Sequence, residues 1–204
     1  MVYAVSLIIG FLIGSIPTAY IIVKRELKLD ITAAGSGNVG ARNAYEVSGS
    51  KTIGLAVLFI DLFKGIVATI CGAYLFDNQF MIAAIAGIGS VLGHNYSPWL
   101  KFKGGRGLAT AAGVMLLLCW SFIVGWLIFY FVLNSFLKNI HVSTVIATVL
   151  CFMSLFVMPD FLLTSIIFSK IVRWDILFLG FTITVLLISK HINPLKEYFS
   201  KASN

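Results

Sequence analysis

Charged side chains are scarce in this chain of 204 residues: they make up 11% of it, against about a quarter in soluble globular proteins. Hydrophobic residues make up 59%, and the mean hydropathy is +0.99. A soluble globule is therefore excluded, because too few polar groups are present to face water. Apolar stretches of about 20 residues recur along the sequence, which predicts an all-α, polytopic membrane bundle that forms a single domain over residues 1–204.

Cysteine is scarce as well, and the three that occur, Cys71, Cys119 and Cys151, all lie inside apolar stretches. An odd number without paired spacing supports neither a disulfide framework nor a metal site. We interpret these residues as small hydrophobic side chains, and we expect neither a metal nor a cofactor.

The apolar stretches predict about seven transmembrane helices. Single spans are expected over residues 2–23, 52–76, 80–92, 142–157 and 176–189, with turns at 77–79 and at Pro159 and Asp160. Residues 161–168 are expected to add to the last crossing. The run over 108–137 is long for one helix, since roughly 20 residues cross the hydrocarbon, so we interpret it as two short spans that turn near Trp120 and Ser121.

The formal net charge of +7 would suit a nucleic-acid partner, but the positions of the cations indicate membrane loops instead. With seven crossings, one face collects 12 of the 15 cations, and the positive-inside rule makes that face cytoplasmic. The N-terminus is then outside, the C-terminus is cytoplasmic, and no nucleic acid is expected. The cations of this face are Lys24, Arg25, Lys28, Arg42, Lys51, Lys101, Lys103, Arg106, Lys138, Lys190, Lys196 and Lys201.

Two opposite charges lie within an expected span. Asp61 and Lys64 are three residues apart and so share one helix face. Each would cost about 2.5 to 3.5 kcal/mol at the middle of the bilayer, so the two should pair or face a polar cavity. An internal ion pair that stabilises the bundle is the simpler interpretation.

The first polar cluster lies at residues 35–43, where three glycines, a hydroxyl, two amides and a guanidinium stand beside the membrane. Glycine lets a ligand approach the backbone closely, and serine and asparagine can hold oxygen atoms. The glycines alone would also suit a flexible turn before the next helix. The polar side chains of this cluster are Ser36, Asn38, Arg42 and Asn43.

The second cluster, residues 93–107, contains His94 and leads through a glycine-rich segment around Arg106 into a helix expected to begin at Leu108. Unpaired N–H groups at a helix N-terminus and the forked guanidinium of an arginine suit an anion such as phosphate. The pattern is not a Walker A loop. A basic loop that contacts anionic lipid headgroups is the alternative.

Two further histidines are expected at helix ends on the same face. His141 is followed by Ser143 and Thr144, which read equally well as N-caps, and His191 stands between Lys190 and Asn193. Taken alone each signal is weak, because a histidine at a helix end is more often a capping or surface residue.

At residues 35–43 and 93–107 the chain resembles the bacterial membrane glycerol-3-phosphate acyltransferases that use acyl phosphate as donor. Their first motif, Gly-Ser-Gly-Asn-x-Gly-Ala-x-Asn, is matched throughout. Their second motif, Gly-His followed by Pro and then Lys-Phe-x-Gly-Gly-Lys-Gly, is matched with Arg106 in place of the last lysine. The resemblance extends to the length of the chain, the order of the spans and the segment 61–65.

The resemblance implies a seven-helix enzyme of the bacterial cytoplasmic (inner) membrane with its active site at the cytoplasmic face. It would move a fatty acyl group from acyl phosphate to the 1-hydroxyl of glycerol 3-phosphate, giving lysophosphatidate and phosphate in phospholipid synthesis. Ser36, Arg106 and His191 would be catalytic. The substrates would be bound by Gly35, Gly37, Asn38, Arg42, Asn43, His94, Lys103, Gly104, Gly105, Gly107, Ser143, Lys190 and Asn193.

Several alternatives stay open at this point. The attacking hydroxyl needs a proton acceptor, and His191, His94 and a phosphate oxygen of the substrate are all candidates. The same glycine loops could serve a small-anion transporter or channel, or a lipid-binding scaffold without catalysis.

The sequence departs from the family pattern around residue 42. The family has threonine at position 42 and arginine at 46, whereas this chain has Arg42 and Glu46. We hypothesise that the guanidinium has moved by one helical turn and that Glu46 pairs with it. A divergent enzyme with an altered substrate is the alternative.

Overall fold

The computed structural model describes residues 1–75, 79–169 and 171–202, so Asp77 and Asn78 of the expected turn lie outside the described residues. Within the described ranges the chain forms helices and short 3-10 turns and no strand. The helices are α1 (Val2–Ser15), α2 (Thr18–Leu27), α3 (Ala41–Ser48), α4 (Lys51–Leu75), α5 (Phe80–Asn95), α6 (Leu108–Leu118), α7 (Trp120–Leu137), α8 (Ile140–Ser154), α9 (Arg173–Ser189) and α10 (Ile192–Ala202), and the 3-10 turns are η1 (Ile31–Ala33), η2 (Pro98–Leu100) and η3 (Asp160–Leu162).

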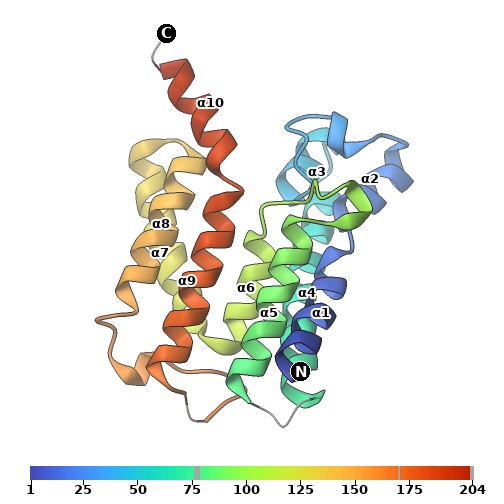
Figure 1. Cartoon of the computed structure of the whole chain (residues 1–204). Coiled ribbons are helices and arrows are strands. Elements are labelled where there is room, and N and C mark those ends of the chain that lie inside the picture. Colours follow the sequence, from blue (N-terminus) through green and yellow to red (C-terminus); the bar gives the residue numbers. More distant parts are fainter. Residues whose placement is uncertain (76–78, 170, 203–204) are drawn as a thin grey trace. The chain divides into compact units, whose positions relative to one another are not determined.

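The chain divides into two compact units, Met1–Val114 and Met115–Asn204. In the first unit α1, α4 and α5 pack side by side (Figure 1). The contact between α1 and α5 depends on small residues: a Cβ added to Gly14 would lie 1.9 Å from the carbonyl oxygen of Ser90, and one added to Gly93 would lie 2.1 Å from that of Phe11. Close approach of helices through small residues is typical of membrane bundles.

The first expected span is interrupted rather than continuous. Helix α1 ends at Ser15 and α2 begins at Thr18, because Pro17 between them has no N–H group to continue the ladder. The carbonyl groups that this break leaves unpaired find side-chain donors. Lys64 Nζ donates to Ile16 O over 2.8 Å, and Ser97 Oγ donates to Ser15 O over 2.6 Å.

A small core holds the polar segment that follows α2. Ile31 and Val39, at the two ends of this segment, are buried against side chains of α2, α3 and α4. Asp30 caps η1, and the hydrogen bonds from the hydroxyl and the backbone N–H of Thr32 hold the pKa of Asp30 below its usual value. The segment is therefore anchored at both ends.

In the second unit α8 packs against α7 and α9 (Figure 1). Trp126 Nε1 donates to Thr148 Oγ1 over 2.9 Å, which joins α7 to α8. Arg173, the first residue of α9, donates to the carbonyl oxygens of Leu155 and Met158 over 2.8 Å each and pairs with Asp160. These bonds satisfy carbonyl groups of the segment that follows the end of α8 at Ser154.

Among the described residues, three helical stretches are long and apolar enough to cross a membrane: Val2–Leu27, Lys51–Leu75 and Trp120–Leu137. The bent pair Arg173–Ser189 and Ile192–Ser200 makes a fourth if it counts as one span. An all-helical fold with candidate membrane spans is thus confirmed for the described residues. The expected run over 108–137 is indeed two helices, broken at Cys119.

Two local expectations were wrong, and one helix was not expected. Gly93, His94 and Asn95 belong to the last turn of α5 and not to a loop. Residues 161–168 do not extend a helix, since only the η3 turn forms there. Helix α10 was not expected, although its pattern of apolar and charged side chains is amphipathic.

Candidate functional site

Ser36 lies in a tight loop between η1 and α3, which we name the serine loop (residues 34–40). Gly35 and Gly37 flank it with φ angles of +58° and +68°, values that suit glycine and strain most other residues. The Ser36 side chain is exposed. The loop can therefore present the Ser36 hydroxyl to a ligand.

Asn43 holds the serine loop from the inside. Its Nδ2 donates to the carbonyl oxygens of Ala34 and Asn38 over 3.0 Å each and to that of Ile31 over 3.4 Å. Its Oδ1 accepts the Ser36 N–H over 2.9 Å. Asn43 is 1% exposed, so its amide fixes the loop, and a part in binding substrate stays a prediction.

A second segment, residues 103–107, leads into α6, and we name it the glycine loop. It is pinned to the end of α5: Gly104 N–H donates to Asn95 O over 3.2 Å, and Gly105 N–H donates to His94 O over 3.0 Å. A Cβ added to Gly104 would lie 2.0 Å from His94 O. Glycine is required here because the backbone of the loop lies directly on α5.

The two loops meet within the first unit. A Cβ on Gly105 would lie 2.8 Å from Val39 O, the carbonyl of the serine loop, and 2.1 Å from Nε2 of His94. A small cavity of about 10 Å³ lies at this meeting point, lined by Ser15, Ile16, Pro17, Thr18, Val39, His94, Ser97, Leu100, Gly104 and Gly105. Two segments separated by some sixty residues of sequence thus form one neighbourhood.

Arg106 stands between Gly105 and Gly107, two residues before α6 begins. It is half-buried, whereas Lys103 at the other end of the glycine loop is exposed. The φ angle of Gly107 is +79°, which turns the chain into the helix. The Arg106 guanidinium therefore belongs to a residue that lies just before the N-terminus of α6, as expected from the sequence.

The ion pair expected on α4 is confirmed. Lys64 Nζ lies 2.7 Å from Asp61 Oδ1, and both side chains are buried. The same ammonium lies 3.4 Å from Nδ1 of His94. The sequence did not predict this third partner, because His94 lies on a different helix, thirty residues further along the chain.

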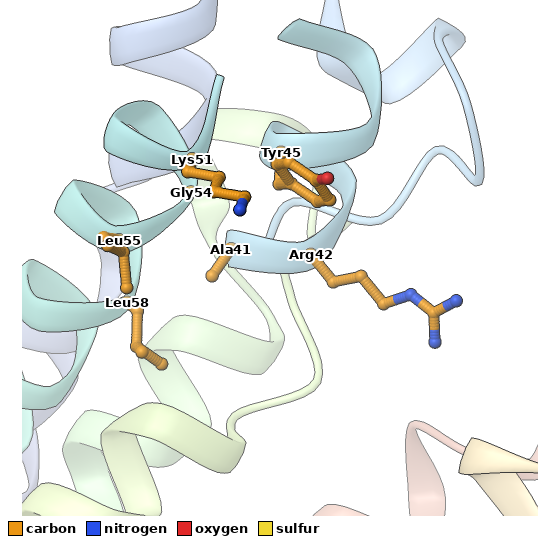
Figure 2. Close-up of a pocket in the computed structure, with 7 residues that line it drawn as sticks. All are labelled: Ala41, Arg42, Tyr45, Lys51, Gly54, Leu55 and Leu58. Atoms are coloured by element: carbon orange, nitrogen blue, oxygen red, sulfur yellow. The ribbon is translucent and has the colours of Figure 1, made fainter. Parts of the chain in front are cut away.

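The ion pair hypothesised on α3 is confirmed as well: Arg42 Nε lies 2.7 Å from Glu46 Oε1. Beside it α3 and α4 form an open groove of about 400 Å³, whose lining residues are Ala41, Arg42, Tyr45, Lys51, Gly54, Leu55 and Leu58. Figure 2 shows Leu55 and Leu58 along one wall and Arg42 directed away from them. The groove is apolar, with lysine and arginine at its edge.

In the second unit, Ser143 lies in the first turn of α8 and is fully buried. The N-cap of α8 is Asn139, whose Oδ1 accepts from the N–H groups of His141 and Val142, so Ser143 is not a cap. The rings of His141 and His191 lie 5.6 Å apart, centroid to centroid. Sequence reasoning did not pair these two histidines.

His191 is 1% exposed and lies between α9 and α10. Its Nδ1 lies 2.8 Å from Leu187 O. Since a carbonyl oxygen only accepts, Nδ1 carries the proton, and Nε2 of the neutral ring is a proton acceptor. Of the neighbouring candidates, Lys190 is half-buried, and Asn193, in the first turn of α10, is exposed.

The apolar helices of both units define a multi-pass membrane protein. Residues 4–201 match the family model described as "Glycerol-3-phosphate acyltransferase". The chain belongs to the glycerol-3-phosphate acyltransferase family.

Individual relatives agree with the family match. The glycerol-3-phosphate acyltransferase of Staphylococcus aureus (strain bovine RF122 / ET3-1) is 29% identical over 206 residues, covering 98% of this chain and 95% of the relative. A crystal structure of PlsY (YgiH), an integral membrane glycerol 3-phosphate acyltransferase, in its glycerol 3-phosphate form is 28% identical, covers 98% of this chain and 92% of that chain, and has a TM-score of 0.80. The lysophosphatidic acid form is 29% identical over the same shares, with a TM-score of 0.75.

Proposed function

We propose that this protein transfers a fatty acyl group from acyl phosphate to the 1-hydroxyl of glycerol 3-phosphate. One observation carries the proposal: the serine loop and the glycine loop meet at Val39 and Gly105 in a chain of this acyltransferase family. Solved relatives in a glycerol 3-phosphate form and a lysophosphatidic acid form support the acceptor and the product.

The reaction needs no covalent bond between the substrate and the protein. The hydroxyl oxygen attacks the acyl carbonyl carbon, the bond from that carbon to the phosphate oxygen breaks, and the hydroxyl proton passes to an acceptor. Phosphate is already a good leaving group, so the protein must chiefly orient two anions and stabilise charge at the carbonyl. In our proposal Ser36 and Asn38 bind glycerol 3-phosphate, and Arg106, held by the glycine loop directly before α6, binds phosphate oxygens.

The hydrogen bonds of the two histidine rings favour His191 over His94 as the proton acceptor. His94 Nδ1 faces the Lys64 ammonium, which only donates, so the proton of the neutral His94 ring is on Nε2. His191 has the opposite arrangement, with Nε2 as acceptor. A phosphate oxygen of the substrate is the other candidate. In the proposal Ser143, Lys190 and Asn193 complete the binding residues of the second unit.

The acyl-phosphate donor is supported by the groove on α3 and α4. Its leucines suit an acyl chain, and Lys51 among its lining residues suits a phosphate. We propose that this groove takes the donor.

We further infer that the chain forms one domain in the bacterial cytoplasmic membrane and crosses it seven times. Helices α5, α6, α8 and α9 would cross in addition to the long spans. The N-terminus would be outside, and the candidate site would be at the cytoplasmic face, in agreement with the distribution of cations along the sequence.

The test is product formation by the purified protein from radiolabelled glycerol 3-phosphate. Lysophosphatidate should form with palmitoyl phosphate and not with the acyl carrier protein or coenzyme A thioesters. Absence of product with all three donors would contradict the enzyme function, and product with a thioester alone would contradict the proposed donor.

Gly104→Ala is expected to raise the KM for glycerol 3-phosphate by roughly tenfold, because the new Cβ would lie 2.0 Å from His94 O and force the glycine loop off α5. Steady-state kinetics measure the effect. Gly125→Ala is the control, since its Cβ would meet only Cys151 Sγ at an ordinary 3.6 Å. Equal kinetics for the two variants would show that the position of the glycine loop does not matter for binding.

Arg42→Ala is expected to weaken glycerol 3-phosphate binding by roughly tenfold if Arg42 has taken over the role of the family arginine. Glu46→Gln removes the competing carboxylate and should leave binding unchanged or tighten it. Titration calorimetry measures both constants. An Arg42→Ala protein with wild-type affinity would refute the hypothesis that the guanidinium moved by one turn.

A further inference from the structure

The buried pair on α4 is linked to the glycine loop through one histidine. Lys64 Nζ lies 2.7 Å from Asp61 Oδ1 and 3.4 Å from His94 Nδ1, and His94 Nδ1 lies 3.7 Å from Asp61 Oδ1. All three side chains are less than a tenth exposed. The reaction proposed above uses neither Asp61 nor Lys64.

The ammonium of Lys64 is fully committed. Besides Asp61 and His94, it donates to Ile16 O over 2.8 Å and to Gly14 O over 3.3 Å, at the break between α1 and α2. The three N–H bonds of the ammonium thus have partners at Gly14 O, Ile16 O and His94 Nδ1, beside the ion pair with Asp61. An ammonium fixed in this way keeps one position against the histidine ring.

This position decides which nitrogen of His94 carries the proton. An ammonium has no lone pair, so Nδ1 faces it as an acceptor. A protonated Nδ1 would instead set an N–H against an N–H, and Asp61 at 3.7 Å is too far to accept it. The neutral ring therefore carries its proton on Nε2.

Nε2 of His94 is the nitrogen that faces the glycine loop. A Cβ on Gly105 would lie 2.1 Å from it, so the ring edge lies directly against the Gly105 backbone. The carbonyl oxygen of His94 accepts the Gly105 N–H over 3.0 Å. His94 thus meets the loop in two ways: its carbonyl accepts the Gly105 N–H, and its ring packs against the Gly105 backbone.

We propose that Asp61 and Lys64 are positioning residues that act through His94: they keep the His94 proton on Nε2 and so hold the glycine loop in the conformation that binds a phosphate group. The inference rests on the proposed function, because it takes the glycine loop as a phosphate site. It differs from a purely stabilising ion pair, which would affect unfolding and leave both the His94 tautomer and substrate affinity unchanged.

The double variant Asp61→Asn/Lys64→Met tests the proposal. It removes both charges together, since removing one would leave the other buried and unpaired. Thr69→Val is the matched control on the same helix: it loses a buried hydroxyl that donates to Gly65 O over 2.8 Å but has no link to His94. All proteins are measured as full chains in detergent.

The first readout is the nitrogen NMR spectrum of protein with isotopically labelled histidine, in which the His94 signals are those missing from a His94→Gln sample. The wild type and Thr69→Val should show a neutral His94 with a protonated Nε2 and a bare Nδ1. The double variant should lose this single tautomer. A proton on Nδ1 of the wild-type ring overturns the proposal even if the double variant does not fold.

The second readout is steady-state kinetics. The double variant should raise the KM for glycerol 3-phosphate by about 10- to 100-fold, with kcat changed by less than about threefold, because binding energy is lost equally before and during the reaction. Product from the wild type together with an unchanged KM in the double variant overturns the inference alone. Absence of product from the wild type overturns the proposed function. In that case the nitrogen NMR spectrum of His94 still decides which of its ring nitrogens carries the proton.

Discussion

Replacing Arg106 by alanine should lower kcat/KM for lysophosphatidate formation by about 100-fold or more. Truncating one partner of a desolvated, hydrogen-bonded charge pair typically costs about 2 to 5 kcal/mol. Arg106 stands in the glycine loop, directly before α6, where its planar guanidinium can bind two phosphate oxygens at once. The measurement is kcat/KM with palmitoyl phosphate and radiolabelled glycerol 3-phosphate.

Two companion variants separate geometry from charge. Arg106→Lys loses the fork but keeps the charge and restores the lysine of the family motif, so it should be much more active than Arg106→Ala. Lys101→Gln removes an exposed cation that lies just before the glycine loop and should leave kcat/KM unchanged. If Arg106→Ala and Lys101→Gln behaved alike, the guanidinium would have no part in phosphate binding.

Asn43→Ala should be nearly as damaging, with activity lowered by roughly 100-fold. The variant removes three donated hydrogen bonds to the serine loop and the acceptor of the Ser36 N–H. Without them the loop loses its fixed conformation, and a misplacement of about 1 Å can cost about 100-fold in rate. Each buried hydrogen bond contributes about 1 kcal/mol, so the thermal unfolding temperature should also fall.

Two further variants test which hydrogen bonds of Asn43 matter. Asn43→Asp keeps the acceptor for Ser36 N–H but cannot donate to the three carbonyl groups, so it should be about as inactive as alanine. Ser48→Ala, on the same helix, loses a 3.4 Å bond to Tyr45 O and the 3.1 Å bond from the Ser50 N–H, both outside the serine loop, and should retain full activity. An active Asn43→Ala protein would show that the serine loop does not need this anchor.

The order of most helices could be predicted, because the thickness of the membrane sets the length of the apolar runs that cross it. The run over 108–137 exceeded one span, and it does break at Cys119. The interruption at Pro17 was not predicted, because hydropathy alone does not show where a proline breaks an apolar helix. The break is stable because side chains donate to the carbonyl groups that the proline leaves unpaired. Those partners, Lys64 and Ser97, are distant in sequence.

In the candidate site, too, local contacts could be predicted from the sequence and contacts between distant residues could not. Local pairs follow from helical spacing, and both Arg42–Glu46 and Asp61–Lys64 are formed. The contact of Lys64 with His94 depends on how α4 packs against α5, which spacing cannot give. Likewise the sequence offered Asn43 as a ligand-binding side chain, whereas its amide is occupied by the backbone of the serine loop.

Calorimetric titration of glycerol 3-phosphate into the purified protein tests most directly whether the two loops hold the substrate phosphate. We expect saturable binding to the wild type, competition by inorganic phosphate, and at least about tenfold weaker binding in both Ser36→Ala and Arg106→Ala. Wild-type affinity in both variants, one from each loop, would contradict the account.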